Sequence, residues 1–220
     1  MSQIDPHRLF DAFLFDMDGT VLTSIKAAER VWTRWAEGHG IDIATLLATM
    51  HGMRAIDTVR RVAPPGLDVQ AEADKISRAE IADVEGIEPI PGAAEFLAAL
   101  PADRWAIVTS APRALAERRI QAAGLPLPGV LVSADDVSHG KPSPEPFQLG
   151  AEKLGFDVED CLIFEDAPAG IQAAETAGSA LVVVTAGHAQ PVATTHPTIT
   201  DYAQLSVAHE QGRGLRVNRN

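Results

Sequence analysis

The chain has 220 residues, of which 46% are hydrophobic and 22% are charged, and it contains one cysteine, Cys161. This composition is ordinary for a soluble globular protein, and a single cysteine excludes a disulfide framework or a zinc cluster. The formal net charge of -12 argues against a broad nucleic-acid-binding surface, which would be basic. No apolar run is long enough to span a membrane, and residues 1–7 lack the pattern of a secretory signal, so we expect a cytoplasmic protein with no membrane or nucleic-acid partner.

The first predicted element is a buried β-strand over roughly Ala12–Asp16, which is apolar, rich in aromatic residues and too short for a helix. It ends in two aspartates one residue apart, Asp16 and Asp18, which Gly19 and Thr20 follow. Ligands bind at the carboxyl ends of strands in open α/β sheets, and buried carboxylates need a cation or a hydrogen-bond donor. Taken alone, Asp18 is also typical of a turn. With Asp16 beside it, the stretch predicts a partner, most simply a hard cation.

The next segment has the periodicity of helices and contains no strand signal. Glycines or prolines end each apolar pattern, as is typical of helix termini. We therefore expect a helical insertion over 23–87, which divides an α/β core into residues 1–22 and 88–220. The helices expected in it run from Ser24 to Gly38 or Gly40, over Ile43–Met50, over Ala55–Val62 and from about Val69 to Val84.

After Pro91, predicted strands and predicted helices alternate along the chain. Continuous apolar strands that alternate with helices are typical of a parallel sheet covered on both faces, so we expect an α/β fold with a Rossmann-like sheet. The polar, basic residues 211–220 are expected to be mobile. The predicted strands are Trp105–Thr109, Val130–Val132, Cys161–Phe164 and Ala180–Val184, and the predicted helices are Ala93–Leu100, Pro112–Ala123, Pro144–Leu154 and Pro168–Ala177.

Polar residues follow several of these strands and converge on one edge if the strands are parallel. Thr109 and Ser110 follow one strand, Glu165 and Asp166 follow another, and Lys141 precedes a predicted helix. Converging carboxylates repel one another unless a cation lies between them, and oxygen ligands favour magnesium over zinc. Together with a hydroxyl and a lysine, such a cation makes a phosphate site. Each residue taken alone has a simpler explanation, as a helix cap or a solvated loop lysine.

In this order, the motifs resemble the four motifs of the haloacid-dehalogenase (HAD) superfamily of phosphohydrolases. They are Asp16-Met17-Asp18-Gly19-Thr20, Thr109-Ser110, Lys141 and Glu165-Asp166, and the helical insertion resembles the small α-helical cap domain of that family. The resemblance implies a HAD-like core with an inserted cap, and the activity of a phosphoric monoester hydrolase.

The resemblance also implies a role for each motif residue. Asp16 would be the nucleophile that forms an aspartyl-phosphate, and Asp18 would be the general acid and then the general base. Mg²⁺ would be held by Asp16, by the backbone carbonyl of Asp18 and by Asp166, with Glu165 nearby. This division is physically reasonable, because a metal-bound carboxylate stays ionised while a neighbour off the metal can carry a proton.

The phosphate would be bound by Thr109, Ser110 and Lys141 according to the same resemblance. In this family the cap usually selects the substrate, and His51 and Arg54 lie between two predicted cap helices. They could hydrogen-bond a sugar or polyol hydroxyl or contact the phosphate. Alternatively, His51 ends a helix, favoured by its dipole, and Arg54 is solvated.

The cap resembles the branch that dephosphorylates hexitol, sugar and glycerol phosphates. We therefore expect a Mg²⁺-dependent phosphatase, a monomer or weak dimer, that acts on a small phosphorylated metabolite. Thr23 stands where many relatives carry an aspartate, which leaves substrate preference or cap closure open. Phosphoglycolate phosphatase and β-phosphoglucomutase-like enzymes are alternatives, although Ala28 replaces the cap histidine of sugar-phosphate mutases. A phospho-receiver signalling module is a third, although receivers lack the Asp18-Gly19-Thr20 continuation and a helical insertion.

Overall fold

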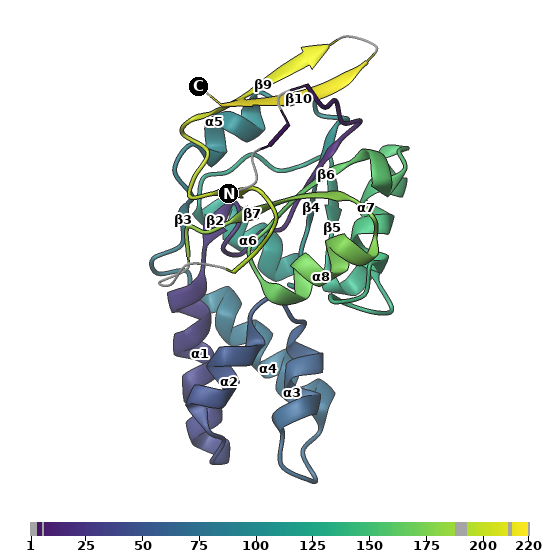
Figure 1. Ribbon diagram of the computed structural model, residues 1–220. Coiled ribbons are helices and arrows are strands. Elements are labelled where there is room, and N and C mark those ends of the chain that lie inside the picture. Colours follow the sequence, from purple (N-terminus) through teal and green to yellow (C-terminus); the bar gives the residue numbers. More distant parts are fainter. Residues whose placement is uncertain (1–3, 6, 188–192, 211–212, 220) are drawn as a thin grey trace.

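The computed structural model describes residues 4–5, 7–187, 193–210 and 213–219. Its centre is a sheet whose neighbouring strands are all parallel (Figure 1). The predicted α/β fold with a Rossmann-like parallel sheet is thereby confirmed. The strand order is β5 (Val130–Val132), β4 (Trp105–Val108), β1 (Phe13–Phe15), β6 (Leu162–Glu165), β7 (Ala180–Val184) and β8 (Thr198–Ile199).

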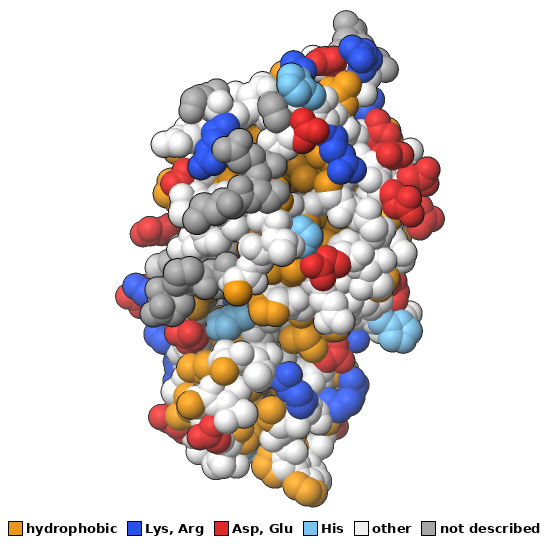
Figure 2. Space-filling view, in the orientation of Figure 1, with side chains coloured by type: hydrophobic (Ala, Val, Ile, Leu, Met, Phe, Trp, Pro, Cys, Tyr) orange, Lys and Arg blue, Asp and Glu red, His pale blue; other side chains and the backbone are white. Residues whose placement is uncertain are grey.

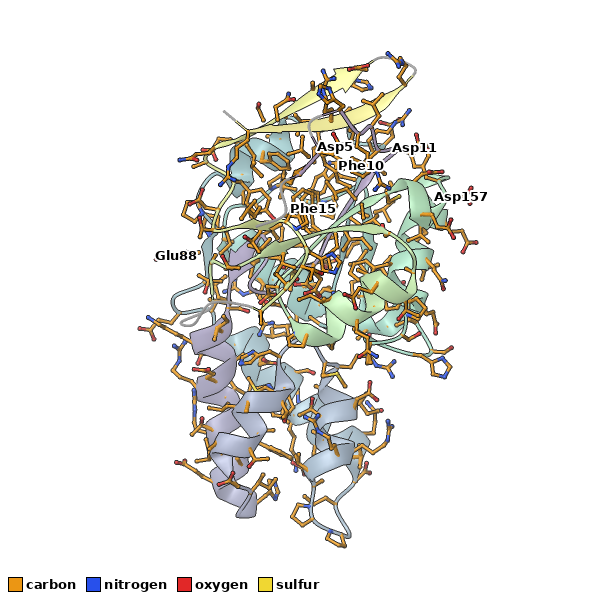
Figure 3. All side chains as sticks on the ribbon, in the orientation of Figure 1. Asp5, Phe10, Asp11, Phe15, Glu88 and Asp157 are labelled. Carbon is orange, nitrogen blue, oxygen red and sulfur yellow. The ribbon has the colours of Figure 1, made fainter. Side chains whose placement is uncertain are left out.

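Helices bury both faces of this sheet, which explains why its strands are continuous apolar runs. Successive side chains of a strand point to opposite faces, so Phe13 and Phe15 belong to one hydrophobic cluster and Leu14 to the other. Phe10 and Phe15 lie in the interior of the first cluster (Figure 3). The first cluster includes α5 (Ala93–Ala98) and α6 (Arg113–Ala122), and the second includes α7 (Glu145–Leu154) and α8 (Pro168–Thr176). Two short 3₁₀-helices are η1 (Ala134–Asp136) and η2 (Val158–Asp160).

The helical insertion follows β1 and its turn in the chain and lies below the sheet in the view of Figure 1. It has a hydrophobic core of its own. Trp32 is buried in that core, and its ring packs edge-to-face against Trp35 with centroids 5.6 Å apart. Two short antiparallel strands, which the sequence did not predict, join the insertion to the core. The elements are β2 (Leu22–Thr23), α1 (Ile25–His39), α2 (Ile43–Met50), α3 (Ala55–Val62), α4 (Val69–Ala82) and β3 (Glu88–Pro89).

The C-terminal segment differs from the expectation of a mobile tail. Residues 211, 212 and 220 lie outside the described residues, but β10 (Gly214–Arg219) pairs with β9 (Leu205–Glu210) as an antiparallel hairpin. Leu215 and Val217 are buried against the first hydrophobic cluster. Their alternation with polar neighbours has the period of a half-buried strand, a signal that the basic composition of the segment concealed.

The described residues form no helix that is both long enough and apolar enough to cross a membrane. On the face shown in Figure 2, basic side chains are scattered over the surface, and several acidic side chains lie together at its upper right edge.

Candidate active site

The carboxyl ends of β4, β1 and β6, which are neighbours in the sheet, bring the predicted motifs together. Asp16 directly follows β1, Thr109 directly follows β4, and Glu165 is the last residue of β6. The backbone N–H of Asp16 donates to the carbonyl of Phe164 at 2.9 Å, which continues the pairing of β1 with β6. The parallel register therefore places these side chains at one edge of the sheet, as the sequence predicted.

Lys141 lies at the centre of this cluster with a fully buried side chain. Its Nζ donates to Asp16 Oδ1 at 2.6 Å, to Glu165 Oε1 at 2.8 Å and to the backbone carbonyl of Val108 at 3.1 Å. Burial alone would lower the pKa of Lys141, but the two carboxylates outweigh it and hold that pKa above its ordinary value. Lys141 is therefore a permanent positive charge beneath Asp16.

Glu165 is fixed by the turn that follows its own strand. Its Oε2 accepts the backbone N–H groups of Asp166 and Ala167, both at 2.6 Å. The space beside its carboxylate exists because Gly170 of α8 has no side chain: a Cβ there would lie 1.6 Å from Glu165 Oε1. The glycine of α8 is thus required by the packing of the carboxylate.

We predict that Gly170→Ala destabilises the protein by about 1–3 kcal/mol, the usual cost of overpacking a well-filled site. The added methyl group must displace a carboxylate that Lys141 and two backbone amides hold in place. Urea unfolding measures the change. Gly38→Ala is the matched control, because Gly38 also lies within a helix and has open space around it; it should raise stability by about 0.5–1 kcal/mol. Equal stabilities for the two variants would contradict the prediction.

The carboxylates of Asp16, Glu165 and Asp166 could hold a metal ion, because their ligand atoms lie within 4.8 Å of one another. Burial raises the pKa of Asp16 to about 7 although Lys141 opposes the shift, and Glu165 and Asp18 raise it further. Burial, and then Glu165 and Asp16, also raise the pKa of Asp166. One lysine does not balance three carboxylates, so a divalent cation with a preference for oxygen fits this site.

The backbone at Gly19 passes close to the carboxylate of Asp166. Gly19 has a φ of +90°, and a Cβ there would lie 2.1 Å from Asp166 Oδ2. The next residue, Thr20, donates its hydroxyl to Asp166 Oδ1 at 3.3 Å. The Gly19-Thr20 pair of the first motif therefore lets the chain pass close to Asp166 and positions its carboxylate.

Asp18 lies apart from Lys141 and is held by other groups. Its Oδ1 accepts from the hydroxyl of Ser24 and from Arg119 Nη1 at 2.9 Å. Arg119 Nη2 donates in turn to Glu80 Oε1 at 2.9 Å, and so connects the core with α4 of the insertion. These contacts orient the Asp18 carboxylate. Its side chain is still 27% exposed, so it remains accessible from solvent.

A cavity of about 90 Å³ lies between the core and the helical insertion. This volume is smaller than the roughly 300–1,000 Å³ of a typical small-molecule pocket. We call it the active-site cavity; the residues of interest that line it are Asp16, Asp18, Glu80, Thr109, Arg119 and Asp166, together with Ser110 and His51.

Of the two residues of the insertion that were predicted to bind substrate, one lines the active-site cavity and the other does not. His51 lines the active-site cavity, and its Nε2 is 3.8 Å from Glu29 Oε1. Arg54 does not line it: its Nε donates to Asp57 at 2.7 Å, and its Nη1 donates to the carbonyls of Val137 and Ser138. Arg54 therefore connects the insertion to the core and does not line the active-site cavity.

The two predicted phosphate-binding hydroxyls both line the cavity, but both have partners. Thr109 Oγ1 accepts the backbone N–H of Ala111 at 3.1 Å, and Ser110 Oγ donates to the carbonyl of Gly52 in the insertion at 2.8 Å. Thr109 Oγ1 remains able to donate its own proton. Ser110 would have to exchange its partner to bind a phosphate.

Sequence reasoning missed Glu80 and Arg119, although a weak signal for each was present. Arg119 occurs on the same helical stripe as Leu115 and Ala116, and Glu80 on the same stripe as Ile76. Charged residues are almost never fully buried unless they are paired. A charge on the apolar face of two separate helices therefore indicates a pair, although the pattern does not say which residues form it.

Comparison with known proteins identifies a family of hydrolases and several similar phosphatases. A model of haloacid dehalogenase-like hydrolases matches residues 10–178. Hexitol phosphatase A of Escherichia coli (strain K12) is 40% identical over 181 residues, covering 79% of this chain and 82% of that protein. Glycerol-1-phosphate phosphohydrolase 2 of Saccharomyces cerevisiae is 31% identical over 183 residues, covering 78% of this chain and 73% of that protein.

The fold is also similar to that of a solved hydrolase structure. The crystal structure of a hydrolase from Pseudomonas syringae is similar with a TM-score of 0.73 and 25% identity, covering 82% of this chain and 87% of that one. The family match includes all four predicted motifs, from Asp16 to Asp166. The resemblance stated from the sequence is confirmed: the chain belongs to the haloacid dehalogenase-like hydrolases.

Proposed function

We propose that this hydrolase is a Mg²⁺-dependent phosphatase of small sugar or polyol phosphates. The observation that carries the proposal is the buried contact of 2.6 Å between Lys141 and Asp16 at the base of the active-site cavity. A carboxylate fixed in this way beside a permanent cation, with Asp18 and Thr109 in the same cavity, suits attack on an anionic phosphoryl group. The names of the relatives, a hexitol phosphatase and a glycerol-1-phosphate phosphohydrolase, support the substrate class.

In the proposed reaction, Asp16 supplies the nucleophile. A carboxylate oxygen attacks phosphorus while the bond between phosphorus and the leaving oxygen breaks, which gives an aspartyl-phosphate and an alcohol. Water then attacks phosphorus, releases inorganic phosphate and restores Asp16. Lys141 remains beneath the carboxylate through both steps and offsets the negative charge that gathers there.

Asp18 is proposed to move the protons. It gives a proton to the leaving alkoxide in the first step and takes one from the attacking water in the second. Its contacts with Ser24 and Arg119 fix the orientation of its carboxylate in the cavity. Thr109 and Ser110 are proposed to bind the phosphoryl oxygens, the latter after it has exchanged its bond to Gly52.

Asp16, Asp166 and the backbone carbonyl of Asp18 are proposed to hold Mg²⁺, with Glu165 nearby. When bound, the ion would neutralise negative charge on the phosphoryl oxygens. The close approach of three buried carboxylates, which a single lysine does not balance, supports this assignment. Ala28 also lines the active-site cavity, where the resemblance places a histidine in the sugar-phosphate mutases, and this favours transfer of the phosphoryl group to water.

The direct test is the release of inorganic phosphate from a panel of phosphomonoesters with Mg²⁺. The panel includes hexitol, glycerol and sugar phosphates, together with phosphoglycolate and β-glucose 1-phosphate. We expect release from the sugar or polyol members. The absence of release from every member would overturn the proposal, and isomerisation of β-glucose 1-phosphate in the presence of a bisphosphate would favour a mutase.

We predict that Mg²⁺ stabilises the folded protein and that its removal abolishes phosphate release. An ion present at about 100 times its Kd stabilises by about 2.7 kcal/mol, which for a chain of this size raises Tm by about 5–10 °C. The shift is measured by thermal unfolding with Mg²⁺ and with a chelator. Asp166→Asn should lose it, whereas Asp160→Asn, an exposed control, should keep it. Release that survives chelation, with no change in Tm, would exclude a resident Mg²⁺.

A further inference from the structure

A buried carboxylate of the helical insertion faces the reacting groups across the active-site cavity. Glu80, on α4, is 5% exposed and lines this cavity together with Asp16 and Asp18. Glu80 is carried by the insertion, whereas Asp16 is carried by the core, and under the proposed function we place the leaving group of a substrate on the insertion side of the cavity. Any role of Glu80 toward that leaving group rests on the proposed phosphatase function.

The basic side chains around this part of the cavity already form ion pairs with carboxylates. Among the described residues that line the active-site cavity, Arg119 is the only lysine or arginine. Its guanidinium is shared between Glu80 and Asp18, each at 2.9 Å. Lys141 lies beneath the cavity and bonds to Asp16 and Glu165. The carboxylates therefore outnumber the cations around the space for the leaving group.

The other basic groups of the insertion do not change this balance. Arg54, the cation that the sequence suggested for the substrate, is bonded to Asp57 and to two carbonyls outside the cavity. His51 does line the cavity, but Glu29 is 3.8 Å from its ring. Burial raises the pKa of Glu80, and Arg119 opposes that shift.

We propose that Glu80 makes the active-site cavity selective for phosphomonoesters whose leaving group is uncharged, and that it rejects those with a second acidic group. A hydroxyl of a polyol or sugar can donate to the Glu80 carboxylate, which is an acceptor only. A carboxylate or a second phosphate in the same place would be a desolvated anion beside another anion, and the described cations nearby are already paired. The same exclusion acts against a bisphosphate, which a mutase would need.

Glu80 and Arg119 also connect the insertion with the core, so a purely structural role for the pair has to be separated from a role in selectivity. A structural role would change turnover of all substrates by the same factor. A role in selectivity changes the ratio between two substrates that differ only in the charge of the leaving group. The ratio of kcat/KM values within a matched pair is therefore the quantity to measure.

Two matched pairs are suitable: sorbitol 6-phosphate with 6-phosphogluconate, and glycerol 3-phosphate with 3-phosphoglycerate. In each pair a terminal hydroxymethyl group is replaced by a carboxylate. For the full chain with Mg²⁺, we expect kcat/KM to favour the uncharged member by at least about tenfold. This comparison needs no variant, so equal values within both pairs would overturn the proposal even if no variant folds.

The variant Glu80→Gln removes the charge and keeps the shape and an acceptor for Arg119. We expect the preference for the uncharged member to fall by about tenfold in this variant. Asp74→Asn removes a carboxylate from the same helix outside the active-site cavity, and should leave the preference unchanged. An equal loss for both members of a pair in Glu80→Gln would assign the residue to the attachment of the insertion and overturn the proposal. Hydrolysis of neither member of either pair, nor of any other phosphomonoester, would instead overturn the proposed function, and with it this inference.

Discussion

Asp16→Asn is expected to abolish phosphate release, with a loss of about three orders of magnitude or more in kcat, as for the removal of other catalytic nucleophiles. An amide oxygen is a poor nucleophile, and the uncharged amide would no longer be the anionic partner of Lys141, now 2.6 Å away. The measurement is the initial rate of phosphate release with Mg²⁺ and the best substrate of the panel. Mass spectrometry after acid quenching should find the phosphorylated chain in the unaltered protein and not in the variant.

The control for this experiment is Asp103→Asn, which alters an exposed aspartate in the loop before β4. It should turn over at the rate of the unaltered protein. Circular dichroism then shows whether Asp16→Asn is folded. A folded Asp16→Asn protein that retains most of its rate would show that the nucleophile is another group, and the assignment of Asp16 would be wrong.

Lys141→Met is expected to cost the most stability of the changes considered, about 3–5 kcal/mol, because it leaves buried carboxylates without their cation. Asp16 and Glu165 both lose a charged donor at less than 3 Å, while the Glu165 side chain is fully buried and the Asp16 side chain is only 7% exposed. Urea unfolding in the presence of a chelator measures the free energy of unfolding without a contribution from bound metal. Phosphate release should be lost as well.

Lys153→Met is the matched control, because Lys153 is 38% exposed and contacts Asp136 at the longer distance of 3.4 Å. Its free energy of unfolding should change by no more than about 0.5 kcal/mol. If Lys141→Met were as mild as this control, the carboxylates around Lys141 would have to hold a proton between them in the folded protein. The role of Lys141 as the balancing charge would then be excluded.

The sheet and the four motifs could be predicted because each depends on a local signal. Buried parallel strands are continuous apolar runs, and the polar residue that ends each run marks the edge of the sheet. Phe13–Phe15, Trp105–Val108 and Leu162–Glu165 all follow this rule. The helices Ile43–Met50 and Ala55–Val62 have the bounds that their periodicity and flanking residues predicted.

The features that were missed depend on contacts between distant segments. The partner of Arg119 on the insertion is 39 residues away, and its partner Asp18 is 101 residues away. Helical periodicity places Arg119 on a buried face but carries no information about what it meets there. In the same way, Arg54 is held by carbonyls 83 and 84 residues further along the chain, and the hairpin of β9 and β10 is identified by its packing rather than by its composition.

The bond from Ser110 to the carbonyl of Gly52 has a consequence for how tightly a substrate is bound. A serine hydroxyl has a single proton to donate, so it cannot serve Gly52 and a phosphoryl oxygen at once. If Ser110 binds the phosphate as proposed, the incoming phosphoryl group and the loop of the insertion compete for the same proton. Breaking the hydrogen bond between Ser110 and Gly52 then costs part of the free energy of phosphate binding. Re-forming the same hydrogen bond assists the departure of inorganic phosphate.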